Sequence, residues 1–200
     1  MSLFNTAKIH SQISGKMYLR SQLFVVLIIA TTAAAVFSSP SSVSARSQPL
    51  ISSSFSVALE TLQKHLNYEF KNIGYLRRAM THSSYSEENN KAFSLLGESI
   101  IETTVALKSL LKDVDISSKD LNDKISEVSN VDTSCAVDGM RLGLQNVVRV
   151  SSSTDSSTAS IVCGAFRAIF GAVALDTGKS DDAGDVFWTV HGGVGIAVSK

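Results

Sequence analysis

Apolar residues recur three and four positions apart along most of the chain beyond residue 50, which is the spacing of amphipathic helices. Two stretches differ, because residues 23–37 and 159–175 are apolar almost without interruption. Both prolines, Pro40 and Pro49, follow the first of these stretches, and no proline occurs later. Proline is costly inside a helix and the later sequence shows little alternation, so the pattern predicts an all-α fold.

The periodic stretches predict helices at 57–66, 73–81, 93–111, around 121–128, 132–142, 159–175 and 181–191. Ser117 is a candidate N-cap and Gly143 a candidate C-cap. The polar stretch 151–160 is expected to be a loop. The longest periodic helix is expected to bury one face, made of Phe93, Leu96, Ile100, Leu107, Leu110 and Leu111.

The same pattern divides the chain into parts. Residues 1–45 are expected to be a signal or targeting segment containing the apolar run 23–37, residues 46–56 a Ser-rich linker, 57–192 the folded domain and 193–200 a tail. The run is short for a bilayer span, which needs ~20 residues, and suits a signal peptide. Such a segment would engage a translocation machinery or a membrane. We therefore expect the secretory pathway or endomembranes, with the segment either cleaved or kept as an anchor.

An organellar destination is the alternative, in a mitochondrion or plastid. The leader is rich in serine and the first acidic residue of the chain is Glu60, as in transit peptides. Its compact apolar run argues against this alternative, because transit peptides are amphipathic and richer in arginine.

The expected domain is more acidic than the net charge of the whole chain suggests. The whole chain has a formal net charge of +0, but four basic residues precede Glu60, which leaves 14 Lys and Arg against 18 Asp and Glu in the rest. An acidic domain is a poor match for a protein that grips phosphates electrostatically. The two cysteines, Cys135 and Cys163, lie among small apolar residues and are expected to be buried, unreactive thiols, with a disulfide between them as an open alternative.

Five short segments, in this order, resemble the endonuclease domain of the ribonuclease III family. They are LQKHLNYEF (62–70), AMTHSSY (79–85), LLGESI (95–100), LGL (142–144) and AIFGAVALD (168–176). The similarity runs from about 59 to 191 and implies that family's helical bundle, here without a double-stranded-RNA-binding domain. The amino-acid sequence of these segments is especially similar to that of short plant members of the family that carry a leader.

The resemblance implies a reaction, hydrolysis of double-stranded RNA with Mg²⁺ held by carboxylates. The family places them at i and i+4 on the signature helix and at i and i+3 on the late apolar helix. These positions are Ser94, Glu98, Gly164 and Arg167 in this sequence. Three of the four carboxylates are replaced, so no catalytic set is intact, and Glu98 is the only remaining candidate metal ligand.

A one-residue slip in this alignment would not restore the site, because no acidic residue lies between Asp155 and Asp176. We expect Glu98 and Arg167 to form an ion pair in place of the metal site. No cofactor is expected, with Mg²⁺ as the exception if the chain is an enzyme after all.

Other candidates receive structural interpretations. Glu102, four residues after Glu98, is expected to be a solvated helix charge, and His82 to have a structural role. His191 is expected at a helix end and Trp188 in the core or an interface.

Three functional hypotheses follow. The first is a non-catalytic ribonuclease III-like protein, a pseudoenzyme acting as an RNA-processing-related or protein-interaction module. The second is an active metal-dependent endonuclease with a remodelled site. The third is an endomembrane protein with a role in nuclear fusion (karyogamy), which the similarity to the plant members implies. The resemblance also implies a homodimer formed through the helices flanking the signature, with weak binding of double-stranded or structured RNA, or of a protein partner.

Overall fold

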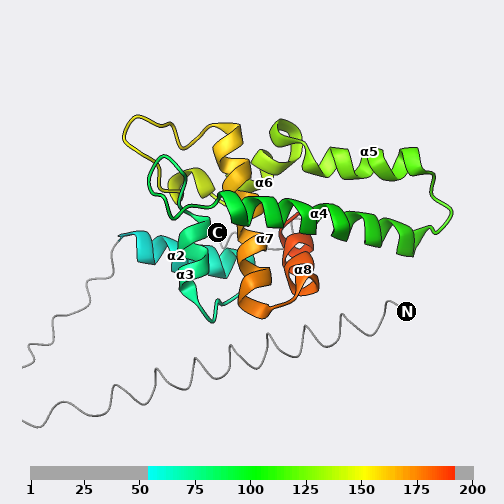
Figure 1. Ribbon diagram of the computed structural model, residues 1–200, viewed down its shortest axis with the longest axis horizontal. Coiled ribbons are helices and arrows are strands. Elements are labelled where there is room, and N and C mark those ends of the chain that lie inside the picture. Colours follow the sequence, from blue (N-terminus) through cyan, green and yellow to red (C-terminus); the bar gives the residue numbers. More distant parts are fainter. Residues whose placement is uncertain (1–53, 192–200) are drawn as a thin grey trace, which may run out of the picture. The chain divides into compact units, whose positions relative to one another are not determined.

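The computed structural model describes residues 54–191, and all regular secondary structure within that range is helical (Figure 1). A single parallel bridge pairs Thr81 with Arg149 in the described part. The predicted all-α fold is therefore confirmed. The predictions for the leader and the C-terminal tail, as well as most of the linker, fall on 1–53 and 192–200, outside the described residues.

The helices follow the predicted order. They are α2 (Ser54–Leu66), α3 (Ile73–Ala79), α4 (Lys91–Lys112), α5 (Ser118–Ser129), the π-helical turn η1 (Val131–Cys135), α6 (Ala136–Arg141), the 3-10 turn η2 (Leu144–Asn146), α7 (Ala159–Thr177) and α8 (Ser180–His191). The predicted helix 132–142 is in two pieces, η1 and α6. Helix α2 starts at Ser54, inside the expected linker.

Local capping explains several of these boundaries. The Ser117 hydroxyl accepts a hydrogen bond from the Asp120 amide and starts α5. Gly143 follows α6 with φ 76°, a left-handed conformation that suits glycine. The Asn130 side chain accepts from the amides of Asp132 and Thr133, which separates η1 from α5.

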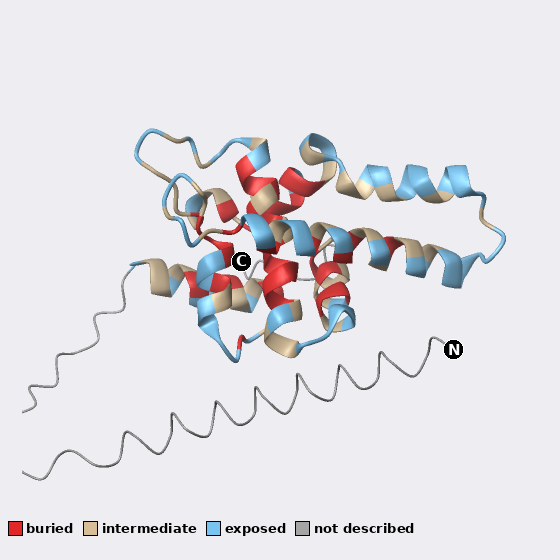
Figure 2. Cartoon of the chain, viewed as in Figure 1, coloured by how far each residue is buried: buried red, intermediate tan, exposed pale blue. Residues whose placement is uncertain are grey.

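Helix α7 is the centre of the body. Figure 2 shows it buried along most of its length, and it contacts α3, α4, α6 and α8. Phe166 and Phe170 stack edge to face at 4.9 Å between ring centroids, and Phe187 of α8 adds a third ring 5.4 Å from Phe170. α7 is long and apolar enough to cross a membrane by composition, but its burial identifies it as a core helix.

Two glycines allow the backbones of α4 and α7 to touch. A Cβ atom on Gly97 would lie 1.8 Å from the Arg167 carbonyl oxygen, and one on Gly171 would lie 2.2 Å from that of Phe93. No larger residue fits at either position without moving a helix. This contact aligns the signature part of α4 with the middle of α7.

The expected buried face of α4 is partly wrong. Phe93 and Ile100 are buried as predicted, but Leu107 and Leu111 are 54% and 79% exposed, and Leu96 and Leu110 are also exposed. The reason is tertiary, because Leu107 and Leu111 line an open cavity beside α8 instead of packing into the core. The last turns of α4 extend beyond the body and pair with α5, which has no fully buried residue (Figures 1 and 2).

Candidate functional site

The four positions that the family resemblance assigns to metal ligands come together where α4 meets α7. Ser94 and Glu98 are one turn apart on α4, and Gly164 and Arg167 are one turn apart on α7. A Cβ atom built on Gly164 would lie 3.9 Å from the Ser94 hydroxyl oxygen. The two helices therefore present these four residues to one another.

An ion pair links the other two positions. Nη1 of Arg167 lies 2.8 Å from Oε1 of Glu98. The side chains are 15% and 34% exposed, so the pair is partly shielded from water. The predicted ion pair between Glu98 and Arg167 is confirmed.

The guanidinium also reaches α5. Nη2 of Arg167 donates a 2.8 Å hydrogen bond to the carbonyl oxygen of Ser129, the last residue of α5. A helix C-terminus carries unpaired carbonyls and partial negative charge, so it is a favourable partner for arginine. One side chain of α7 thus binds α4 and α5 together.

Glu102 belongs to the same group, contrary to the expectation of a solvated charge. The Ser129 hydroxyl donates to its Oε1 at 3.2 Å. Spacing along α4 placed Glu102 near Glu98, but the partner from α5 is visible only in three dimensions. Polar contacts therefore run from Glu98 through Arg167 and Ser129 to Glu102.

This arrangement is a poor cation site. Among residues 54–191 no group of three or more His, Cys, Asp or Glu side chains lies close enough together to hold a metal ion. The Glu98 carboxylate already has a positive partner in Arg167. Ser94 and Gly164 supply no negative charge. The arrangement pairs a carboxylate with a guanidinium and lacks the several oxygen ligands that Mg²⁺ requires.

The two cysteines lie beside this group, and the expectation of free thiols is wrong. Cys135 and Cys163 form a disulfide with a Cα–Cα distance of 5.0 Å, joining the end of η1 to α7. Both residues are buried, as expected. A separation of 28 residues carries no signal for pairing, so the sequence could not choose between a bond and two thiols.

A second polar group, which the sequence pattern does not predict, is centred on Asp138 of α6. This buried carboxylate lies 2.6 Å from Nδ1 of His191 and 2.5 Å from Nη2 of Arg141. Arg141 also donates to the Val190 carbonyl oxygen at 2.8 Å. The group lies on the wall of a cavity of about 490 Å³ that Trp188 also lines. It ties α6 to the last turn of α8, and the only sequence signal was an acidic residue among small apolar ones.

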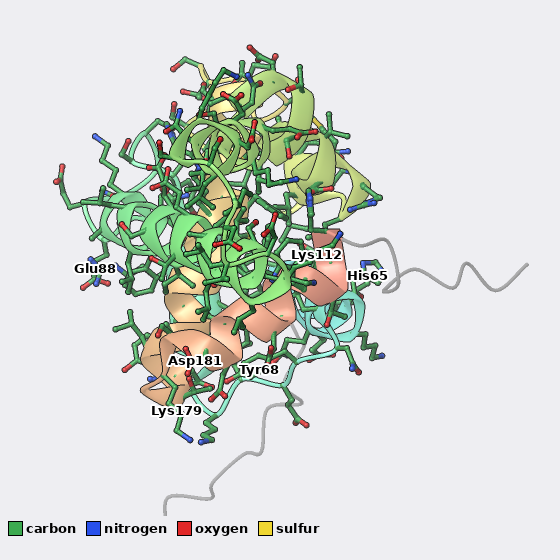
Figure 3. The ribbon with its side chains drawn as sticks, turned by 90° about the vertical axis from the view of Figure 1, so that its right-hand side faces the viewer. His65, Tyr68, Glu88, Lys112, Lys179 and Asp181 are labelled. Atoms are coloured by element: carbon green, nitrogen blue, oxygen red, sulfur yellow. A yellow bond between two sulfur atoms is a disulfide. The ribbon has the colours of Figure 1, made fainter. Side chains whose placement is uncertain are left out.

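Asp176, the last residue of the segment 168–176, joins the end of α7 to residues 68–72. Its carboxylate accepts 2.8 Å hydrogen bonds from the Tyr68 hydroxyl and from the amides of Lys71 and Asn72. Burial alone raises the pKa of Asp176, but these hydrogen bonds and the Lys71 charge outweigh it and lower the pKa. In Figure 3, Tyr68 lies at the end of the body that carries Lys179 and Asp181. Two family segments therefore meet in a structural contact.

His82 has the structural role expected of it. Its Nδ1 accepts a hydrogen bond from the Ser84 amide at 3.1 Å, and its own amide donates to the Arg149 carbonyl oxygen at 2.9 Å. Burial, with a smaller contribution from the Lys91 charge, lowers the pKa of His82. The His82 ring stabilises the turn at residues 82–84, and its hydrogen bonds are to Ser84 rather than to Glu98.

The chain is similar to known proteins of the ribonuclease III family. Residues 72–188 match the family described as Ribonuclease-III-like. The chain is 57% identical over 152 residues to Protein NUCLEAR FUSION DEFECTIVE 2 of Arabidopsis thaliana, covering 76% of this chain and 79% of that protein. It is 33% identical over 124 residues to Ribonuclease 3 of Albidiferax ferrireducens, covering 60% of this chain and 54% of that protein.

A solved nuclease domain of ribonuclease III from Campylobacter jejuni superimposes with a TM-score of 0.63 at 26% sequence identity. The match covers 66% of this chain and 94% of the bacterial one. That structure is described as showing flexibility in a region involved in dimer formation.

Proposed function

The chain belongs to the ribonuclease-III-like family, and on that premise we propose that it is a non-catalytic member that acts as an interaction module. One observation carries the proposal. The ion pair between Glu98 and Arg167 occupies the place at which a catalytic member would hold its metal ion. The fold is kept, and the side chains that would cut RNA are replaced.

Electrostatics supports this choice over a remodelled enzyme. A divalent ion about 4 Å from the Arg167 guanidinium would be repelled by roughly 8 kcal/mol at an effective dielectric constant of ~20. The Glu98 carboxylate attracts the ion by a similar amount at the same distance, so the pair together offers no net attraction. Mg²⁺ also needs near-octahedral oxygen ligation, which one carboxylate does not supply.

The excess of acidic over basic residues beyond the leader argues against RNA as the main partner. Outside the four basic residues that precede Glu60, the chain has 14 Lys and Arg against 18 Asp and Glu. Binding to double-stranded RNA depends on phosphate contacts and weakens with salt. A protein partner is therefore favoured, with RNA contacts weak and salt-sensitive.

The first testable prediction concerns cleavage. Purified protein lacking the expected leader, incubated with long double-stranded RNA and Mg²⁺ or Mn²⁺, is expected to give no products of defined length, because the cation has no site. A bacterial ribonuclease III run in parallel shows that the substrate is intact. Products that disappear in the Glu98→Ala variant would establish the active-enzyme alternative instead.

The matched gain-of-function variant is Ser94→Glu/Gly164→Asp/Arg167→Glu, which returns three carboxylates beside Glu98. The space around Gly164 permits its new side chain. We expect Mn²⁺ to raise the melting temperature of this variant by several degrees, since an ion at 100 times its Kd adds about 2.7 kcal/mol of stability. The unmodified protein should show no such shift, and an equal shift in both would contradict the proposal.

A homodimer is the second part of the proposal. Leu95 of α4 is 68% exposed and Leu96 is 38% exposed, both in the signature segment. Neighbouring exposed leucines favour a contact surface. The description of the Campylobacter jejuni nuclease domain, which mentions dimer formation, adds support.

Light scattering during size-exclusion chromatography tests the dimer. The unmodified protein is expected to elute with twice the chain mass and Leu95→Glu with the mass of one chain, because a buried carboxylate would weaken the contact. Leu111→Glu is the control, since Leu111 is 79% exposed near the end of the projecting part of α4. A dimer that survives Leu95→Glu would place the contact elsewhere.

A second functional proposal rests on the Arabidopsis relative, whose name refers to nuclear fusion. At 57% identity over most of both chains, a shared role in nuclear fusion is the natural extension. We expect this chain to restore nuclear fusion in Arabidopsis plants that lack the relative, and its Glu98→Ala variant to do so equally. Rescue lost with Glu98→Ala alone, at equal protein level, would indicate that the carboxylate acts chemically.

A further inference from the structure

Residues 129–135, which link α5 to α6, are held at both ends by one face of α7. Cys163 and Arg167 are four positions apart on that helix, so their side chains project to the same side. Arg167 donates to the Ser129 carbonyl oxygen at one end of the segment, and Cys163 is bonded to Cys135 at the other.

Besides these two ties, this part of the chain is held by partly buried packing of α5 on α4 and of Val131 on the core, and by the hydrogen bond from the Ser129 hydroxyl to Glu102. Helix α5 has no fully buried residue, and its Ile125 and Val128 are only partly buried. The Asn130 side chain bonds only to amides within the segment itself. The disulfide is therefore the strongest single tie between η1 and α7.

We propose that Cys135 and Cys163 are oxidised to a disulfide as the protein folds in an oxidising compartment, and that this bond holds residues 129–135 in place beside Arg167. The reaction is thiol–disulfide exchange. The two cysteine thiols lose two electrons and two protons in forming the bond. A disulfide of a thiol oxidoreductase accepts them and becomes two thiols.

Burial distinguishes a structural bond from a reversible switch. Cys135 and Cys163 are each only 2% exposed. A thiolate must reach a sulfur atom to reduce or exchange a disulfide, and neither sulfur is accessible in the folded protein. The bond therefore forms before η1 packs on α7, and it resists reductants once the protein is folded.

This conclusion bears on the destination of the chain. Disulfides persist in secreted and luminal proteins and are rare where glutathione and thioredoxin keep thiols reduced. The pair favours the secretory pathway among the destinations that the leader leaves open.

Thiol counting on the full chain tests the oxidation. Protein from its native cells is quenched in acid, denatured and treated with a mass-tagged maleimide, with and without prior reduction. Because the sequence contains two cysteines, the expected result is no tag before reduction and two tags after it. Two tags without reduction would overturn the proposal, and one tag would show that a different partner is bonded.

Hydrogen exchange tests the holding role. In the Cys135→Ser/Cys163→Ser variant we expect amides of residues 118–135 to exchange at least tenfold faster and those of α2 and α3 to be unchanged. The melting temperature should fall by about 10 °C, from the loop entropy of a bond spanning some 30 residues. The Ser134→Ala variant is the control and should match the unmodified protein.

A lower melting temperature with unchanged exchange in 118–135 would mean that the bond acts only on the unfolded chain, which overturns the holding role. If the double variant does not fold, the unmodified protein is refolded with and without reductant and compared in the same way. Failure to refold under reductant alone would support obligatory oxidation. No measurement here uses RNA, so these outcomes are independent of the proposed lack of catalysis.

Discussion

Gly97→Ala is expected to reduce the free energy of unfolding by about 3 kcal/mol or more, the upper part of the range for overpacked cores. The added Cβ would lie 1.8 Å from the Arg167 carbonyl oxygen and 3.0 Å from the Gly171 nitrogen. These are backbone atoms, so no side-chain rotation relieves the clash, and α4 must move away from α7. Urea denaturation followed by circular dichroism gives the value.

Gly164→Ala is the matched control, because it adds the same methyl group to the same pair of helices. Its Cβ would meet only the Ser94 hydroxyl oxygen, at 3.9 Å, an ordinary contact. Alanine is also a better helix former than glycine, by roughly 0.5–1 kcal/mol. Gly164→Ala should therefore leave stability unchanged or raise it. Equal destabilisation by the two variants would contradict the backbone contact at Gly97.

Arg167→Met is expected to cost about 2 kcal/mol. Removing one partner of a fully buried ion pair costs roughly 3–5 kcal/mol, and we reduce that figure because the Glu98 side chain is 34% exposed and water can reach it. The variant also removes the hydrogen bond to the Ser129 carbonyl oxygen at the end of α5. Methionine keeps most of the apolar stem, so the loss reports on the charged end.

A double-mutant cycle with Glu98→Gln isolates the pair itself. Contacting charges of this kind typically show coupling of about 0.5–3 kcal/mol, and we expect about 1 kcal/mol here. Glu60→Gln in place of Glu98→Gln provides the control, because Glu60 is an exposed residue of α2. Coupling below about 0.3 kcal/mol, the usual limit of additivity, would mean that Glu98 and Arg167 do not interact.

Helix positions were predictable because they depend on local sequence. The 3–4 residue spacing, the Ser117 cap and the Gly143 stop act within one or two turns, and the structure has a helix boundary at each. The ion pair between Glu98 and Arg167 was also predictable, but only because similarity to a known family aligned two segments about 70 residues apart. Local periodicity contains no such information.

The errors share a different physical cause. Leu107 and Leu111 lie on the apolar stripe of α4, yet they stay exposed because they line an open cavity beside α8. The role of Asp138 could not be predicted from local sequence, because its partner His191 is 53 residues away at the end of α8, whereas Arg141 lies three residues away on the same helix. Periodicity specifies which face of a helix is apolar, whereas the packing of neighbouring helices determines how much of that face is buried.

The sequence by itself determined the helical order and showed that Ser94 and Gly164 carry no carboxylate, because residue identity alone decides that they cannot be anionic ligands. Tertiary structure decided which side chains contact one another around these positions. Contact between backbones at Gly97 set Arg167 against Glu98, and folding of the 129–135 segment onto α7 brought Ser129 and Cys135 to Arg167 and Cys163. These partners are far apart in the chain, and only helix packing fixes the distances between them.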